Sequence, residues 1–453
     1  MAWNVVILGG GFGGLFTARK LERLLPPASS RVTLINDVNF MLYTPLLPGA
    51  AGGTLEPRHV VVPLREELKS THLRLARVLS ADPARRAVTI RSPDGNEDVL
   101  HYDQLVVTLG STSRSLPIPG LKEHAVGFKT LSEGIELRNR LVQTLEHAES
   151  IDDDEARDSL LTYVFVGAGY AGVEGLAELQ DFSADVLELY PRCSLHGLRF
   201  VLVEARDRLM PEISQGLADF AGAELRRRGI DIKLGTTIER VSAESTELST
   251  GEVIPTRTVA WTAGVKPHPV VAQLGLPLDG GGRIKVDRFC QVEGFEDVWA
   301  IGDAAAVPDP ARPGQPCPPT CQHAIRQGRT VGGNVAAALG GGGTKRPFTY
   351  KTLGVFVDLG RHQAVAETLG IKWRGFPAWF LARSYHLSQV PGFRRRVRLV
   401  TDWTVGLLFG RDSSELGQLG HPPSLAATGL EEQSSGGTTS AARPAGASAP
   451  AAS

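Results

Sequence analysis

Two glycine motifs of the same form are the residues in this chain whose spacing points most directly to chemistry. Each follows an apolar run and opens a helix-like stretch in the pattern G-x-G-x-x-G. In such a unit the first glycine permits a tight turn, the second lets the backbone approach a pyrophosphate, and the third lets helix and strand pack closely. Two copies indicate two bound dinucleotides, whose usual chemistry is hydride transfer. The motif glycines are Gly9, Gly11 and Gly14 in the first copy, and Gly167, Gly169 and Gly172 in the second.

A polar residue at the end of the second strand of each unit is expected to bond the ribose hydroxyls. In the second unit this residue is Glu204. A carboxylate repels a 2′-phosphate and so favours NADH over NADPH, although Arg206 and Arg208 lie near it and weaken that preference. In the first unit Asn36 holds the position, with one fewer charge-assisted bond, a loss that a tightly bound FAD tolerates. Asp37 is the alternative ribose ligand there.

The elements that position these motifs alternate strand and helix. Pro26 and Pro27 end the first helix, which is predicted over 13–25. The stretch 44–54, TPLLPGAAGGT, is so rich in glycine and proline that we predict no regular element in it. A helical pattern over 131–159 leads into the second glycine motif. Strands are predicted at 3–8, 32–35, 100–110, 163–166, 199–204, 259–265 and 298–305.

This order predicts an α/β fold with two Rossmann-like dinucleotide-binding domains and a C-terminal amphipathic helical region. The strand that ends at Gly302-Asp303 returns to the first sheet, so the NADH-binding domain is inserted in the FAD-binding domain. Two independent domains lying side by side are the alternative. The predicted limits are 1–128 and 285–347 for the FAD-binding domain, 129–284 for the NADH-binding domain, 348–421 for a C-terminal membrane-association or dimer region, and 422–453 for a disordered tail.

Composition excludes several other classes of protein. A formal net charge of -1 offers no global attraction to nucleic acid. We expect no signal peptide, and no apolar run reaches the roughly 18 to 20 residues that a bilayer span needs. The four cysteines and eleven histidines show no zinc or iron–sulfur spacing, so no metal site is predicted. Cys317 and Cys321 are interpreted as structural rather than as a redox pair. A cytoplasmic protein is the simplest expectation.

Several longer stretches resemble one family, the type II NADH:quinone oxidoreductases, within the flavoproteins that carry two dinucleotide-binding domains. The resemblance covers about residues 3–415. It rests on FMLYTPLLPGAAGGT (40–54), on VAWTAGV (259–265) and on GDAA followed by PTCQHAIRQG (319–328). It implies a single-chain, non-proton-pumping dehydrogenase that passes a hydride from NADH to FAD and two electrons on to a membrane quinone.

The resemblance also assigns cofactor residues, position by position. Thr44 and Pro45 correspond to the segment beside the flavin ring, and Asp303 to the residue that bonds the ribityl chain. The residues implied for FAD are Gly9, Gly11, Phe12, Gly13, Gly14, Asn36, Thr44, Pro45, Thr108, Gly110, Gly302 and Asp303. Those implied for NADH are Gly167, Gly169, Tyr170, Gly172, Glu204 and Gly264.

Three further residues are candidates for the catalytic step. Glu174 matches the family's acidic residue between nicotinamide and flavin, for which the resemblance implies a role as proton relay or substrate-positioning group. A carboxylate favoured by the helix dipole is the structural alternative. Gln322 matches the first of two glutamines at the quinone site, but the second position holds Arg326. Arginine brings a permanent charge and five donors, so it binds a polar or anionic acceptor or points toward an acidic partner. His323 is either a proton relay or a packed histidine.

Arg326 keeps two other functions open. One is a soluble NAD(P)H-dependent flavin oxidoreductase, or diaphorase, with a non-quinone acceptor. The other is a redox sensor that binds both nucleotides with little turnover.

Two short amphipathic helices are predicted at 375–388 and 394–410, across the break at Pro391-Gly392. Val397, Val400, Thr404, Leu407 and Leu408 share a face of the second, and Arg394, Arg395, Arg396 and Arg398 lie at its start. This pattern fits a helix lying in lipid headgroups, and the resemblance favours peripheral contact through 375–410 at the cytoplasmic side of the cell membrane. A pair packed on the protein body, or a homodimer interface, is the alternative.

Overall fold

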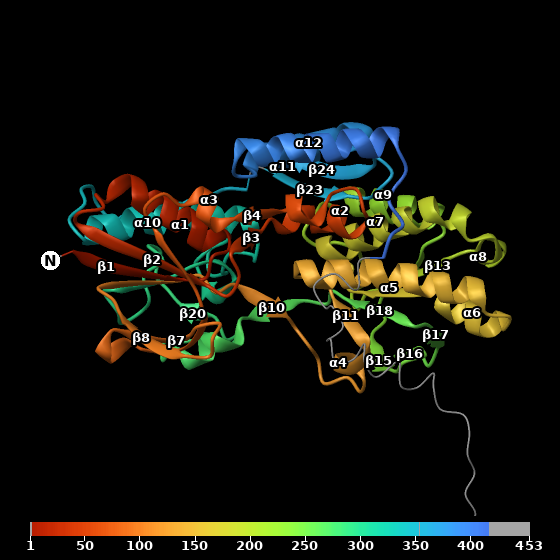
Figure 1. Ribbon diagram of the computed structural model, residues 1–453, viewed down its shortest axis with the longest axis horizontal. Helices are drawn as coiled ribbons and strands as arrows, with labels where there is room; N and C mark the ends of the chain where they lie inside the picture. Colours follow the sequence, from red (N-terminus) through yellow and green to blue (C-terminus); the bar gives the residue numbers. More distant parts are fainter. Residues whose placement is uncertain (1, 353, 416–453) are drawn as a thin grey trace, which may run out of the picture. The chain divides into compact units, whose positions relative to one another are not determined.

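A five-stranded parallel sheet carries the first glycine motif in the computed structural model, which describes residues 2–352 and 354–415 (Figure 1). Its strand order is β21-β9-β1-β2-β5, and every neighbouring pair is parallel. The last strand in sequence, β21, pairs with β9, so the chain returns to this sheet as predicted. The strands are β1 (Trp3–Leu8), β2 (Ser30–Asn36), β5 (His72–Leu75), β9 (Gln104–Val107) and β21 (Val298–Ala300).

A second parallel sheet of five strands lies between β9 and β21 in the sequence, in the order β11-β18-β12-β13-β14. The second Rossmann-like unit is therefore inserted in the first. The two connecting segments pair antiparallel with each other as β10 (Ser111–Ser113) and β19 (Val265–Pro267). The strands of the second sheet are β11 (Ala125–Gly127), β12 (Thr162–Val166), β13 (Arg199–Val203), β14 (Asp231–Lys233) and β18 (Thr258–Trp261).

The exact domain limits remain a prediction. Strand β11 lies just before the expected limit at residue 129 and pairs in the second sheet. Val271, Leu274 and Leu276 lie before the expected limit at 285 and pack into the core of the first sheet.

Helices cover both sheets. In each sheet the strand that precedes the glycine motif, β1 or β12, is followed by a helix that starts inside the motif. α1 (Phe12–Leu24) packs closely on α10 (Cys321–Ala338), so a helix that is about 300 residues later in the sequence lies against the first motif. Thr130 and Glu133 form a capping box at the start of α5 (Leu131–Ser150). The other helices of the two units are α3 (Leu64–Glu67), α4 (Leu121–His124), α6 (Asp154–Leu160), α7 (Tyr170–Val186), α8 (Pro191–His196) and α9 (Gln215–Arg227).

The prediction that 44–54 contains no regular element is wrong. The segment forms a 3-10 turn, η1 (Thr44–Leu46), and a short helix, α2 (Leu47–Ala51). Pro45 and Pro48 lie in the first turns, where the missing N–H has no helical partner to lose. α2 packs on α5 and α7, so tertiary burial outweighs its weak intrinsic propensity.

Smaller sheets and 3-10 turns complete the two units. The strands are β3 (Phe40–Leu42), β4 (Val61–Pro63), β6 (Arg77–Asp82), β7 (Ala87–Arg91), β8 (Glu97–His101), β15 (Ile238–Val241), β16 (Ser245–Leu248), β17 (Val253–Pro255), β20 (Ile284–Lys285) and β22 (Ala305–Ala306). The turns are η2 (Pro57–His59), η3 (Pro83–Arg85), η4 (Leu187–Leu189), η5 (Pro269–Gln273) and η6 (Gly302–Ala304).

The C-terminal region contains a three-stranded antiparallel sheet followed by the two expected helices (Figure 1). α11 (Phe376–Gln389) and α12 (Phe393–Leu408) confirm the helices predicted from the pattern. The sheet, β23 (Gly354–Asp358), β24 (Ala364–Thr368) and β25 (Ile371–Arg374), was not predicted. In the described part of the chain no helix has the length and apolar character to cross a bilayer. The disordered tail predicted for 422–453 lies outside the described residues, as do 416–421.

Candidate functional site

The first glycine motif forms a cradle. The fold requires glycine at two of its three positions, and the third position faces open space. Gly9 has φ +99°, and a Cβ there would lie 2.5 Å from the carbonyl oxygen of Thr108. A Cβ on Gly14 would lie 1.9 Å from the oxygen of Gly9. A Cβ on Gly11 meets nothing within 4 Å, and Gly11 is the N-cap of α1. The open space therefore lies at the amide end of a helix, where a pyrophosphate binds.

The second motif repeats this geometry at the start of α7. Gly167 has φ +102° and lies against Thr262, and a Cβ on Gly172 would lie 1.9 Å from the oxygen of Gly167. Gly169 caps α7, and a Cβ there meets nothing within 4 Å. Both cradles thus fit a dinucleotide pyrophosphate in the same way.

Two threonines hold the turns of the cradles in place. The Thr108 hydroxyl donates to the oxygens of Leu8 at 2.9 Å and Gly9 at 2.7 Å. The Thr262 hydroxyl donates to Val166 at 2.8 Å and Gly167 at 2.9 Å. Sequence reasoning missed Thr262. The signal was present as a repeated T-x-G after each strand, Thr108 to Gly110 and Thr262 to Gly264, and both glycines have positive φ.

Asn36 and Glu204 occupy equivalent positions beside the two cradles. The Asn36 side-chain oxygen accepts from the N–H of Gly10 at 2.8 Å. The Glu204 carboxylate accepts from the N–H of Ala168 at 2.6 Å and from that of Arg206 at 3.0 Å. Both side chains therefore reach the turn of the motif, where a ribose is expected.

The two arginines near Glu204 and the acid next to Asn36 are placed differently. The Arg208 guanidinium donates to the oxygen of Ile213 at 2.7 Å, so it is engaged with its own loop. Arg206 is exposed, and so is Asp37.

The expected ribityl ligand, Asp303, lies in η6 at the end of β21. Its carboxylate accepts from the hydroxyl of Ser111 at 2.5 Å and lies 3.5 Å from the Lys129 ammonium. The N–H of Gly302, which has φ +69°, donates to the side-chain oxygen of Gln327 at 2.8 Å. Ser111, Gly302 and Asp303 line one pocket, which holds polar groups suited to a ribityl chain.

Residues from both units meet at a second pocket. Pro45, from the segment expected beside the flavin, and Glu174, from α7, both line it. Thr44 precedes Pro45 in η1.

Gly13 lies against Ile301 of the first unit. The ring of Phe12 packs edge-on against Tyr43 at 5.5 Å between centroids, and Tyr170 opens α7.

Glu174 is a titratable group that lines this pocket from α7. Its carboxylate accepts from the N–H of Asp358 at 3.0 Å. Burial raises the pKa of Glu174 to about 8, and the carboxylates of Asp358 and Glu178 add to the increase while the hydrogen bond opposes it. A carboxyl that is protonated near neutral pH can give or accept a proton there.

Helix α10 brings together the residues expected at the quinone site. The Tyr350 hydroxyl donates to the side-chain oxygen of Gln322 at 2.7 Å. The Arg326 guanidinium lies 4.2 Å from the centre of the Tyr350 ring and donates to the backbone oxygen of Gln322 at 3.0 Å. Within the described residues no carboxylate lies within ion-pair distance of Arg326. The cation therefore stacks on an aromatic ring.

His323 and the cysteines near α10 are packed groups. His323 is buried, and its ring contacts the hydroxyl of Thr320 at 2.7 Å. Burial lowers the pKa of His323, which keeps the ring neutral. Cys317 and Cys321 are free thiols, and burial raises their pKa values to about 12 and about 11. Neither is a thiolate at neutral pH, so neither is a ready nucleophile.

Known proteins resemble this chain in sequence and in fold. Residues 3–328 match the family Pyridine nucleotide-disulphide oxidoreductase. A probable NADH dehydrogenase of Dictyostelium discoideum is 30% identical over 419 residues, 91% of this chain and 91% of that protein. The type II NADH:quinone oxidoreductase Ndh of Mycobacterium tuberculosis is 30% identical over 430 residues, 92% of this chain and 89% of its own. The solved structure of NDH2 from Plasmodium falciparum with NADH has the same fold, with a TM-score of 0.83 at 17% identity over 91% of this chain and 100% of that one.

Proposed function

Since the chain belongs to the pyridine nucleotide-disulphide oxidoreductase family, and within it to the type II NADH:quinone oxidoreductases, we propose that it oxidises NADH and reduces a quinone through bound FAD. The single observation that carries this function is the pair of matching cradles whose units meet at the pocket lined by Pro45 and Glu174. FAD, when bound, supplies the two-electron carrier between donor and acceptor.

The chain's own residues divide into a flavin side and a nicotinamide side. Residues 1–128 and 285–347 would hold FAD, with its pyrophosphate at Gly11, its ribose at Asn36 and its ribityl chain at Asp303. Residues 129–284 would hold NADH, with its pyrophosphate at Gly169 and its ribose at Glu204. The negative charge of Glu204 supports NADH over NADPH, because a 2′-phosphate would meet a like charge.

The start of α10 supports charge stabilisation at the flavin. The helix follows Pro319 and is capped by Thr320, so its first amides point out of the helix end. Such an end stabilises negative charge that develops as electrons arrive.

The acceptor side would be formed by Gln322, Arg326 and Tyr350. Gln322 offers an uncharged amide to a quinone oxygen, and Tyr350 fixes its orientation. The stacking of Arg326 on Tyr350 supports quinone use, because that stacking keeps the charge on an aromatic face. The same charge favours a polar acceptor in the diaphorase alternative.

Anaerobic mixing of the purified yellow protein with NADH, then with a ubiquinone or menaquinone analogue, tests donor and acceptor together. Flavin absorbance should bleach with NADH and return with the quinone, and Gln322→Ala should slow only the return. Turnover with dyes but never with quinone would favour the diaphorase. Bleaching without reoxidation by any acceptor would favour the sensor.

Peripheral membrane contact is the second part of the proposal. α11 and α12 expose large apolar side chains that are otherwise expected to be buried. Arg394 and Arg398 are exposed beside them, whereas Arg395 is turned inward and donates to the oxygen of Arg58 at 2.8 Å. Cations beside an apolar face fit an anionic lipid surface. The exposed apolar residues are Phe376, Phe380, Phe393, Val397, Val400, Val405, Leu407, Leu408 and Phe409.

Sedimentation with lipid vesicles separates this contact from a homodimer. We expect binding to vesicles that contain anionic lipid, and loss of binding in the double variant Phe393→Ser, Leu408→Ser. Leu195→Ser is the matched control, because Leu195 is 87% exposed and belongs to α8 rather than to α11 or α12. A dimer in solution that becomes a monomer in the double variant, without vesicle binding, would contradict membrane contact. The expected location is the cytoplasmic side of the cell membrane.

A further inference from the structure

The overall reaction consumes one proton, which must reach the quinone. NADH, a quinone and one H⁺ give NAD⁺ and a quinol. The hydride carries two electrons and one of the two hydrogens of the quinol, so the second hydrogen comes from solution as a proton. The pocket where the two units meet is lined by three carboxyl groups, Glu174, Glu178 and Asp358.

The three carboxyl groups converge from two elements that are far apart in sequence. Glu174 and Glu178 lie one turn apart on the same face of α7. Asp358 ends β23, and its N–H donates to the Glu174 carboxylate at 3.0 Å. Its own carboxylate accepts from the N–H of Gly360 at 2.9 Å.

Glu178 differs from a structural carboxylate that hydrogen bonds hold in place. The residue is 3% exposed, and its Oε2 atom has no hydrogen-bond partner among the described residues. The nearest cation, Arg411, lies 3.6 Å from that oxygen, an ion-pair distance that is too long for a hydrogen bond. A buried oxygen in this state is open to a hydrogen bond from water that enters the pocket.

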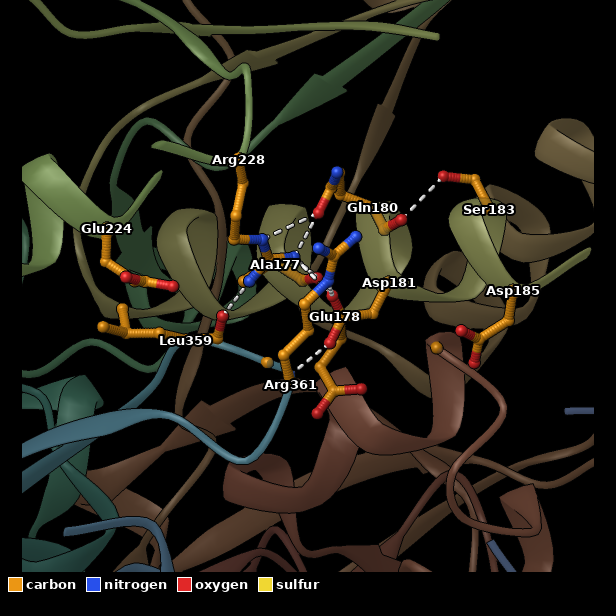
Figure 2. A network of polar contacts seen from close by, with 12 residues as sticks. Ala177, Glu178, Gln180, Asp181, Ser183, Asp185, Glu224, Arg228, Leu359 and Arg361 are labelled. Carbon is orange, nitrogen blue, oxygen red and sulfur yellow. Dashed lines mark hydrogen bonds and ion pairs between the residues drawn. The ribbon is translucent and has the colours of Figure 1, made fainter. Parts of the chain in front are cut away.

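Other charged groups around the pocket are already engaged. Asp181, on the next turn of α7, lies 2.5 Å from Arg228, 3.0 Å from Arg361 and 3.7 Å from Arg411. Figure 2 shows Arg228 and Arg361 converging on Asp181 next to Glu178. Arg228 and Arg361 therefore pair with Asp181, and Arg411 is the one of the three cations that Asp181 shares with Glu178.

The opposite wall of the pocket comes from α11 and α12. Arg383 is the cation that faces Asp358, and His386 is neutral because burial and Arg383 lower its pKa to about 4. Tyr170 faces Glu174 from the start of α7 as a neutral phenol, because burial raises its pKa. Burial and the neighbouring carboxylates also raise the pKa of Asp358. The raised pKa values of Glu174 and Asp358 mean that this pair holds a proton near neutral pH.

We propose that Asp358 and Glu178 form, with Glu174, a proton relay that delivers the proton consumed when the quinone is reduced. The O–H bond of a protonated carboxyl breaks, the proton passes to the quinone side, and the carboxylate is protonated again by water that enters the pocket. The electrons come from NADH, so no further oxidant or reductant is needed. This inference rests on the proposed function.

Two isosteric variants, Asp358→Asn and Glu178→Gln, test the relay on the FAD-loaded protein. The asparagine keeps an oxygen for Gly360, and the backbone donor to Glu174 is unchanged. Hydride transfer from NADH takes up no net proton, so anaerobic bleaching of the flavin should stay within about two-fold of the wild type. Reoxidation by the quinone should slow by roughly ten-fold or more. The slowing should increase toward high pH, and small weak acids should partly restore the rate.

Asp185→Asn is the matched control. Asp185 continues the same helix face with a side chain that is 51% exposed and lies 3.2 Å from Arg411. Its reoxidation rate and pH profile should equal those of the wild type. A second readout is the infrared absorption of protonated carboxyl groups in the resting protein, which should decrease in Asp358→Asn and not in the control.

The outcomes separate the relay from the activity. If wild type is reoxidised by quinone and both variants follow its rate and pH profile, the relay is refuted and the activity stands. If the variants slow bleaching and reoxidation equally, the carboxyl groups are structural and the relay is again refuted. If Asp358→Asn does not retain FAD, Glu178→Gln decides alone. A wild-type protein that NADH bleaches and no quinone reoxidises overturns both the function and the relay.

Discussion

The alanine variants of Gly169 and Gly172 should affect two different properties of the protein. Both glycines belong to the second motif, and both receive the same added methyl group. At Gly172 that methyl would lie 1.9 Å from the oxygen of Gly167, closer than Cβ atoms come to backbone oxygens. At Gly169 it meets no protein atom within 4 Å, and the backbone has φ -73°. One variant therefore perturbs the fold and the other perturbs the ligand.

The structure sets the size of each effect. To accept a methyl, Gly172 and the strand must separate by roughly 1 Å, which costs on the order of 3 kcal/mol in a packed interior. Gly169→Ala should change the free energy of unfolding by less than about 1 kcal/mol. It should displace the pyrophosphate and remove one charge-assisted hydrogen bond, which weakens NADH binding by roughly ten- to hundred-fold.

Thermal unfolding and NADH titration measure the two effects side by side. Gly169→Ala should unfold close to the wild-type temperature and keep its FAD, with a much higher KM for NADH. Gly172→Ala should unfold several degrees lower. If Gly169→Ala binds NADH as tightly as wild type, the pyrophosphate does not lie against this glycine and the assignment of the second cradle is wrong.

Two further predictions concern groups beside the cradles. Thr262→Val removes the donor to Val166 and Gly167, so it should lower the free energy of unfolding by about 1–2 kcal/mol; unchanged thermal unfolding would contradict this. Burial raises the pKa of Glu174 from 4.5 to about 8. Between these two pH values the folded protein keeps a proton that the unfolded chain has released, so wild-type stability falls as pH rises from 4.5 to about 8. Near pH 8, Glu174→Gln should therefore have a free energy of unfolding about 2 kcal/mol higher than wild type, a value kept small because the pocket is partly open to water. Near pH 4 the two proteins should unfold at the same temperature. A gain that is independent of pH would refute the raised pKa.

Some of the candidate site was predictable because its determinants are local. A glycine motif specifies a strand, a turn and a helix within about ten residues, and its chemistry follows from backbone sterics. The return of β21 to the first sheet followed from the ending at Gly302-Asp303 and from the rules for parallel sheets. The T-x-G repeat that contains Thr262 was equally local and readable, although it was overlooked.

Other features were not predictable because they arise from burial against distant segments. Propensity in 44–54 argues against a helix, and α2 forms only because α5 and α7 cover it. Arg395 belongs to a basic run that was predicted to face lipid headgroups, yet its guanidinium is buried and donates to the backbone oxygen of Arg58. Periodicity cannot show which member of a run turns inward.

The sequence by itself determined that this protein has two nucleotide cradles, their order along the chain, and the polar residue beside each. Only the tertiary structure decided what surrounds the point where they meet. Asp358 contacts Glu174 across 184 residues of sequence, and Arg326 depends on Tyr350 from another segment. The physical reason is that a carboxyl's charge state and a cation's partner depend on desolvation and on nearby charges in space. Neither quantity is defined until the chain has folded.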